Sequence, residues 1–218
     1  ANTIGDEKAV EVYRYLLDHT HRQAFLLDIP TFVFFEKEEQ SEYLLNNNYY
    51  SAIQEIGNLG DKMKAAFRKV FELGFNKIII IGTDCLELDA ETVYQAFQSL
   101  KTNEVVLGPA RDGGYYLLGL NELHPKLFEN KNWSTHTVFL DTMTDIKALA
   151  LKVYLLKELT DVDIYQDLSR GIKDVFGIII ASNQPIDQTS ILPKITLIYY
   201  TINKDLRHCV FIFDIALT

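Results

Sequence analysis

Short apolar runs alternate along the chain with longer segments in which apolar residues recur every three or four positions. The short runs have the apolar, often β-branched character of buried strands, and they cover residues 31–35, 78–81, 105–107, 115–120 and 153–156. The longer segments have the periodicity of amphipathic helices, and they lie at residues 5–17, 58–74, 89–100 and 135–150. This alternation of strand and helix predicts a three-layer α/β domain.

The pattern changes near Gly177. Residues 178–180, 195–202 and 210–215 are apolar runs of β type with no amphipathic helix between them. They are typical of extra strands at a sheet edge, and equally of sequence outside the core domain. We therefore divide the chain into an α/β domain at residues 1–176 and a β-rich tail of unknown role at residues 177–218.

Composition limits the classes of function. The chain has 218 residues, enough for one α/β domain, and no apolar run of the roughly 18 or more residues that a membrane span needs. A formal charge of −9 opposes unassisted binding to nucleic acid or to an anionic membrane. An anionic substrate would need a local cation, and the grouped carboxylates favour a divalent metal. Two cysteines without a disulfide framework or a signal peptide predict a soluble cytoplasmic protein.

Acidic residues follow three of the predicted strands. Asp84 comes after residues 78–81, Asp112-Gly113-Gly114 after residues 105–107, and Asp161-Val162-Asp163 after residues 153–156. Ligands of open α/β sheets bind beyond the carboxyl ends of the strands, so acids there are placed to hold Mg²⁺ or Mn²⁺ and a phosphorylated substrate.

Each of these acids also has a purely structural interpretation. Asp84 is equally typical of a turn or a helix cap. Asp112-Gly113-Gly114 has the composition of a hairpin turn, although its glycines would also let the main chain approach a ligand closely. Of Asp161 and Asp163, one could complete a metal site while nearby Asp167 caps a helix, or the cluster could be a solvated surface.

Other side chains could also take part in chemistry. Trp133-Ser134 could stack on a sugar or a base, or the tryptophan could belong to the core. Cys85 could be a nucleophile, although a small buried thiol fits equally well because no histidine is close in sequence. His19 and His21 could bind a metal or lie exposed near a helix end.

Taken together, these segments resemble a bacterial family of nucleotide-diphospho-sugar transferases, the radical-SAM/selenodomain-associated transferase type. The resemblance covers residues 1–168. It rests on Leu59-Gly60-Asp61-Lys62-Met63, Gly82-Thr83-Asp84-Cys85, Gly108-Pro109-Ala110-Arg111-Asp112-Gly113-Gly114-Tyr115-Tyr116-Leu117, Trp133-Ser134-Thr135 and Asp161-Val162-Asp163. It implies a Rossmann-like glycosyltransferase-A fold with a mixed, mostly parallel sheet, related to molybdenum-cofactor and phospholactate guanylyltransferases.

The resemblance also implies roles for individual residues. Asp84 and Asp163 are expected to hold Mg²⁺ or Mn²⁺, with Asp84 next to the diphosphate, and Asp112 is the expected catalytic residue, positioning the acceptor or acting as a base. The remaining residues that match the motifs are expected to bind substrate: Thr83, Gly113, Gly114, Tyr115, Trp133 and Ser134.

The chain departs from the family pattern at two places. Family members normally begin with a strand and a loop rich in glycine, lysine and arginine, whereas this sequence starts after that loop. We therefore expect an N-terminally incomplete domain that lacks the main cationic wall of the nucleotide site. Leu86 stands where the family commonly has a proline, which loosens the turn after Asp84 and Cys85.

The leading hypothesis is a metal-dependent glycosyltransferase that uses a nucleoside-diphosphate sugar and a small-molecule acceptor. A nucleotidyltransferase that uses a nucleoside triphosphate and releases pyrophosphate needs the same metal cradle and stays open. So does an inactive truncated domain or binding module. The sequence leaves the base, the sugar, the acceptor and the oligomeric state undetermined.

Overall fold

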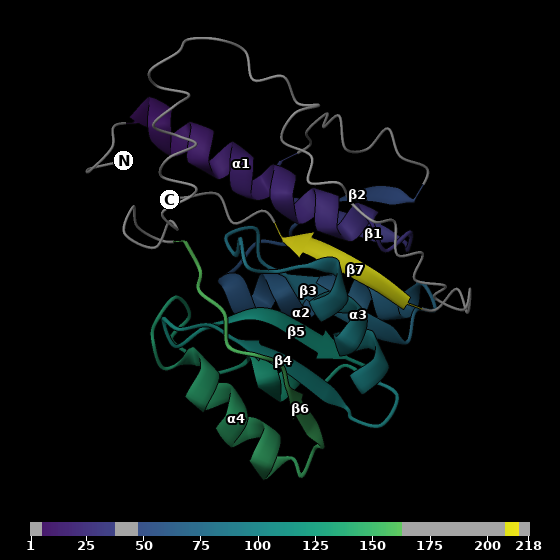
Figure 1. Cartoon of the computed structure of the whole chain (residues 1–218). Coiled ribbons are helices and arrows are strands. Elements are labelled where there is room, and N and C mark those ends of the chain that lie inside the picture. Colours follow the sequence, from purple (N-terminus) through teal and green to yellow (C-terminus); the bar gives the residue numbers. More distant parts are fainter. Residues whose placement is uncertain (1–5, 38–47, 163–207, 214–218) are drawn as a thin grey trace.

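The computed structural model describes residues 6–37, 48–162 and 208–213, which form one mixed sheet with helices on both faces (Figure 1). The helical elements are α1 (Asp6–Phe25), α2 (Leu59–Glu72), α3 (Ala90–Ser99), the 3₁₀ helix η2 (Pro125–Phe128) and α4 (Val138–Ala148). The strands are β1 (Thr31–Phe35), β2 (Tyr49–Ile53), β3 (Lys77–Ile81), β4 (Val105–Pro109), β5 (Tyr115–Leu120), β6 (Val153–Leu155) and β7 (His208–Phe213). In the part of the chain described, no helix is long and apolar enough to cross a membrane.

Within the described residues, the sheet has seven strands in the order β2-β1-β7-β3-β5-β4-β6. Of these described strands, only β5 runs antiparallel to its neighbours, β3 and β4, and the other adjacent strands are parallel. The predicted α/β class with a mixed, mostly parallel sheet is therefore confirmed. The parallel strands β1, β7 and β3 direct their carboxyl ends to one edge, where ligands of such sheets bind.

The sheet separates two apolar cores, as a three-layer fold requires. Strand β3 contributes to both: Ile79 and Ile81 face one core, while Ile78 and Ile80 face the other. Helices α1 and α3 cover the first face, and α2 and α4 cover the second. The run at residues 78–81 lacks alternation because both faces of its strand are buried.

Local signals set the ends of two helices. The Asn58 side chain accepts a hydrogen bond from Asp61 N at 3.1 Å and caps α2, and Asp89 accepts one from Thr92 N at 2.8 Å and caps α3. After α2, Gly74 has a φ of 94°, the left-handed geometry expected of a glycine that follows a helix.

Strand β7 comes from the predicted tail and lies inside the sheet, between β1 and β3 (Figure 1). It runs parallel to both neighbours, with Val210 opposite Thr31 and Cys209 opposite Ile78. Residues 209–212 are buried. The interpretation as an edge strand is therefore wrong for this segment, because β7 pairs with β1 on one side and with β3 on the other. The proposed boundary at residue 176 and the runs at 178–180 and 195–202 lie outside the described residues.

Candidate active site

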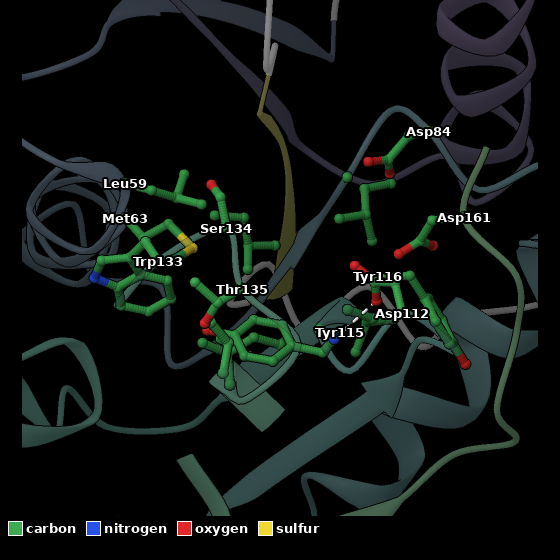
Figure 2. A pocket seen from close by; sticks show the side chains of 17 residues that line it. Leu59, Met63, Asp84, Asp112, Tyr115, Tyr116, Trp133, Ser134, Thr135 and Asp161 are labelled. Atoms are coloured by element: carbon green, nitrogen blue, oxygen red, sulfur yellow. Dashed lines mark hydrogen bonds between the residues drawn. The ribbon is translucent and has the colours of Figure 1, made fainter. Parts of the chain in front are cut away.

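A cavity of about 280 Å³ opens where β3 ends and β5 begins (Figure 2). It lies at the sheet edge expected to bind ligands. The lining side chains come from the loop after β3, the β4–β5 turn, the segment after β6, α2 and the segment before α4. They include Asp84, Asp112, Asp161, Leu59, Met63, Trp133, Ser134 and Tyr115. Segments far apart in the sequence thus meet at one site.

Asp84 lies in the loop after β3, and Asp161 lies in the segment after β6. A main-chain hydrogen bond joins the two segments, because Val162 N donates to the carbonyl oxygen of Asp84 at 2.8 Å. In Figure 2 the carboxylates of Asp84 and Asp161 lie on the same side of the cavity. Asp163, the expected second metal ligand, lies outside the described residues. Asp161 belongs to the same acidic motif, so the sequence signal that pointed to Asp163 also contained Asp161.

The Asp112-Gly113-Gly114 turn connects β4 to β5. Asp112 Oδ1 accepts a hydrogen bond from Gly114 N at 2.8 Å, and Ala110 N donates to Gly114 O at 3.1 Å. Gly113 N in turn donates to Ala110 O at 3.1 Å, and Gly113 has a φ of 94°. The segment is therefore a hairpin turn, and its Asp112 and Gly114 also line the cavity. The hairpin interpretation and the site interpretation are compatible.

Two of the expected substrate-binding residues do not line the cavity. Thr83 is 3% exposed and is buried beside Asp84. Gly113 packs on the backbone before α4, where a Cβ would lie 2.1 Å from His136 O. Phe139 N donates to Gly113 O at 2.9 Å, which fixes the turn against the start of α4. Gly113 thus shapes the site, whereas Gly114, Tyr115, Trp133 and Ser134 line it.

The carboxylates of Asp84 and Asp161 could bind a metal ion that takes its other ligands from substrate phosphates and water. Among the described residues, no group of three or more acidic, histidine or cysteine side chains could hold a metal ion. Mg²⁺, however, commonly binds through one or two carboxylates together with substrate phosphates and water. Asp84 and Asp161 supply hard oxygen ligands of that kind. The described lining includes no lysine, arginine or histidine to neutralise a diphosphate.

Trp133 closes the cavity on the side of α2. A Cβ on Gly60 would lie 2.4 Å from Trp133 Nε1, so only glycine lets the indole lie this close to the helix. Leu59 and Met63 flank Gly60 on α2 and line the cavity with Trp133. Sequence reasoning did not select Leu59 or Met63 as site residues, although the segment that contains them carried the family resemblance.

A buried ion pair supports the segment that carries Trp133. Lys131 Nζ pairs with the carboxylate of Asp145 on α4, and the side chains of Lys131 and Asp145 are 1% and 35% exposed. The ammonium is therefore almost completely covered, while the carboxylate keeps contact with water. Replacing Asp145 and replacing Lys131 should therefore lower the stability of the protein by different amounts.

We expect Asp145→Asn to lower the free energy of unfolding by about 3 kcal/mol, because it leaves a buried ammonium without its counter-charge. Lys131→Met should cost less, since methionine fills the apolar part of the space and Asp145 stays hydrated. Urea denaturation measures both. The chain has a single tryptophan, so a red shift of its emission in Asp145→Asn would report loosening of the segment around Trp133. Equal losses in the two variants would contradict this account.

The remaining sequence candidates, Cys85, His19 and His21, do not line the cavity. Cys85 is 1% exposed, and burial, followed by the negative charge of Asp161, raises the pKa of its thiol, which opposes a nucleophilic role. His19 and His21 lie on α1. His19 Nε2 is 2.7 Å from Leu88 O, and burial lowers the pKa of His21 to about 4. Neither histidine lines the cavity.

Comparisons with known proteins agree with this architecture. A crystal structure of a putative nucleotide-diphospho-sugar transferase from Desulfovibrio desulfuricans G20 superposes with a TM-score of 0.71. The two chains are 24% identical over 83% of this chain and 80% of the other, and at that identity the similarity establishes the fold. No curated protein matches. The family model DUF2064, described as an uncharacterized protein conserved in bacteria, matches residues 21–135, more than half of the chain. The chain therefore belongs to the DUF2064 family and has the fold of the putative nucleotide-diphospho-sugar transferase from D. desulfuricans.

Proposed function

We propose that this protein is a metal-dependent glycosyltransferase that takes its sugar from a nucleoside diphosphate and passes it to a small-molecule acceptor. The observation that carries the proposal is the meeting of Asp84, Asp161 and Asp112 at one cavity beyond the end of β3. The fold shared with a putative nucleotide-diphospho-sugar transferase supports the same chemistry. The free, buried cysteines Cys85 and Cys209 support a cytoplasmic location.

Asp84 and Asp161 would hold Mg²⁺ or Mn²⁺, with Asp163 as a further ligand by the family resemblance. When bound, the metal supplies positive charge next to the diphosphate and stabilises it as a leaving group. The described cavity lining contains no cationic side chain that could do so instead. Metal dependence of donor binding is therefore central to the proposal.

Asp112 is the proposed base. The hydrogen bond from Gly114 N fixes the direction of its carboxylate at the cavity. As the acceptor oxygen forms its bond to the anomeric carbon, the bond from that carbon to the diphosphate oxygen breaks. The nucleoside diphosphate leaves with the electron pair, and Asp112 takes the acceptor proton. Trp133 and Ser134 would contact the sugar at the rim of the cavity.

Nucleotidyl transfer is the second candidate, because the same carboxylates could hold a metal on a nucleoside triphosphate. The two reactions release different products. The protein is incubated with Mn²⁺ and a panel of nucleoside-diphosphate sugars and nucleoside triphosphates, and the products are separated by ion-exchange chromatography. We expect a nucleoside diphosphate to be released, and we expect EDTA to abolish its release. Pyrophosphate would identify nucleotidyl transfer instead. Absence of both products and of metal-dependent nucleotide binding would leave the third alternative, an inactive truncated domain or binding module.

A further inference from the structure

We propose that Glu87 is a positioning residue of the candidate metal site, and that its carboxylate holds Asp161 next to Asp84. The inference rests on the proposed metal-dependent function and adds the residue that sets the geometry of its two carboxylates. Glu87 lies in the loop after β3, three residues beyond Asp84 and outside the motifs that carry the family resemblance. It does not line the cavity. Its role is therefore to place another side chain rather than to touch the metal or the substrate.

Hydrogen bonds tie the main chain on both sides of Asp161 to the loop that carries Asp84. Thr160 N donates to Glu87 Oε2 at 3.1 Å, and Val162 N donates to the carbonyl oxygen of Asp84 at 2.8 Å. The two donors are the residues immediately before and after Asp161, and both acceptors belong to the same loop. Movement of Asp161 away from Asp84 would therefore break at least one of these bonds.

The loop that provides both acceptors is firmly held. Cys85 and Leu88, which lie on either side of Glu87 in the sequence, are each 1% exposed and belong to the core on the α1 and α3 face of the sheet. Leu88 N donates to the carbonyl oxygen of Cys85 at 3.3 Å, and the carbonyl oxygen of Leu88 is 2.7 Å from His19 Nε2 on α1. The main chain of Glu87 is thus anchored on both sides, so its exposed side chain starts from a fixed position.

The segment that carries Asp161 changes its support just before that residue. Leu159 still lies along β4, because Leu159 N donates to the carbonyl oxygen of Pro109 at 3.1 Å, and its side chain is 3% exposed. The next residue, Thr160, donates to Glu87 instead. The bond to Glu87 therefore lies at the point where the segment leaves β4 for the loop that carries the other carboxylate.

A bond of this kind favours metal binding because two carboxylates repel each other when no cation lies between them. Figure 2 shows Asp84 and Asp161 on the same side of the cavity. If Asp161 is held there before the ion arrives, metal binding does not have to order the segment. Loss of an outer partner of the metal ligands typically weakens metal binding about tenfold to a hundredfold. We expect the lower end of that range, because water competes for the exposed Glu87 carboxylate.

Two variants of Glu87 in the full chain test the inference, with binding of Mn²⁺ alone followed by electron paramagnetic resonance. Glu87→Ala removes the acceptor for Thr160 N, and we expect the Kd for Mn²⁺ to rise about tenfold. Glu87→Gln keeps an acceptor oxygen in about the same place, so its Kd should stay within about threefold of wild type. Equal weakening in the two variants would overturn the inference, because the charge of Glu87 and not its hydrogen bond would then be responsible.

Glu104→Ala is the matched control. Glu104 Oε2 accepts a hydrogen bond from Lys152 N at 2.7 Å, at the other end of β6, and Glu104 does not line the cavity. The control therefore loses the same charge and the same kind of bond, and its Kd for Mn²⁺ should stay within about twofold of wild type. If Glu87→Ala binds Mn²⁺ as tightly as Glu104→Ala does, Glu87 only supports the fold, and the inference is overturned.

Turnover distinguishes a positioning role from a catalytic one. In Glu87→Ala the Mn²⁺ concentration that gives half the maximal rate should rise about tenfold, whereas kcat at saturating Mn²⁺ should stay within about threefold of wild type. The reason is that Asp84 and Asp161 are both still present once the ion is bound. A loss of kcat at saturating Mn²⁺ as large as the loss of metal affinity would contradict a positioning role.

A comparison of wild type with Asp84→Asn separates this inference from the proposed function. If Asp84→Asn weakens Mn²⁺ binding and Glu87→Ala does not, the positioning role alone is wrong. If wild type binds no Mn²⁺, or Asp84→Asn binds it equally well, the proposed metal site fails, and the role of Glu87 fails with it.

Discussion

Replacement of Asp84 by asparagine is expected to reduce metal-dependent turnover by about a hundredfold to a thousandfold, the scale for losing one electrostatic group from an active site. Asparagine preserves the shape of the side chain and leaves the main-chain hydrogen bond from Val162 N to residue 84 intact. It removes only the charge that would hold the metal. Initial rates over a range of Mn²⁺ concentrations measure the effect.

Asp141→Asn is the matched control for this change. Asp141 is an exposed aspartate in the first turn of α4, and its carboxylate accepts a hydrogen bond from Thr137 outside the cavity. The control should keep turnover within about twofold of wild type, the small change usual for a surface substitution. Wild-type metal dependence in Asp84→Asn would show that the metal, if used at all, binds elsewhere.

Gly113→Ala is expected to have the second large effect, on both stability and turnover. Gly113 has a φ of 94°, which disfavours any other residue, and a Cβ there would lie 2.1 Å from His136 O. The turn would have to move away from α4, and Asp112 and Gly114 would move with it. We expect a loss of about 3 kcal/mol or more, from backbone strain and steric clash together, and turnover reduced at least tenfold.

Gly74→Ala is the control that measures the cost of backbone strain without a steric clash. Gly74 has the same φ of 94°, but nothing lies within 4 Å of a Cβ placed there. This variant should lose about 1 kcal/mol and keep its turnover, because Gly74 follows α2 far from the cavity lining. Urea denaturation and initial rates measure both variants. Similar losses of stability in the two would mean that contact with His136 contributes nothing.

The strands that were predicted correctly are those whose burial requires a clear pattern of apolar residues in the sequence. Residues 78–81 and 105–107 are buried on both faces, and their uninterrupted apolar runs predicted β3 and β4. Strand β2 was missed, because it has the pattern buried, exposed, exposed, buried, exposed and lies at the sheet edge. The pattern of apolar residues within a strand does not show which strands pair with it. The position of β7 between β1 and β3 was therefore not predicted. Its unbroken apolar run was, however, a sign of burial on both faces.

The candidate site was predicted in part, because position after a strand indicates a sheet edge but not the direction of each side chain. Asp84 and Asp112 both reach the cavity, whereas Thr83, next to Asp84, points into the protein. Neighbouring residues of an extended segment face opposite ways, which adjacency in a motif does not reveal. Leu59 and Met63 belong to a helix segment that carried the family resemblance, but they were not predicted to line a site. Their contribution to the cavity depends on where Trp133 packs, which is tertiary information.

The most direct test of the central claim is the anomalous scattering of Mn²⁺ in crystals grown with the nucleoside-diphosphate sugar that the protein cleaves. We expect one manganese ion in contact with the carboxylates of Asp84 and Asp161, with the diphosphate bound to the same ion and the sugar directed into the cavity. A diphosphate bound without manganese, or a manganese ion away from these two aspartates, would contradict it.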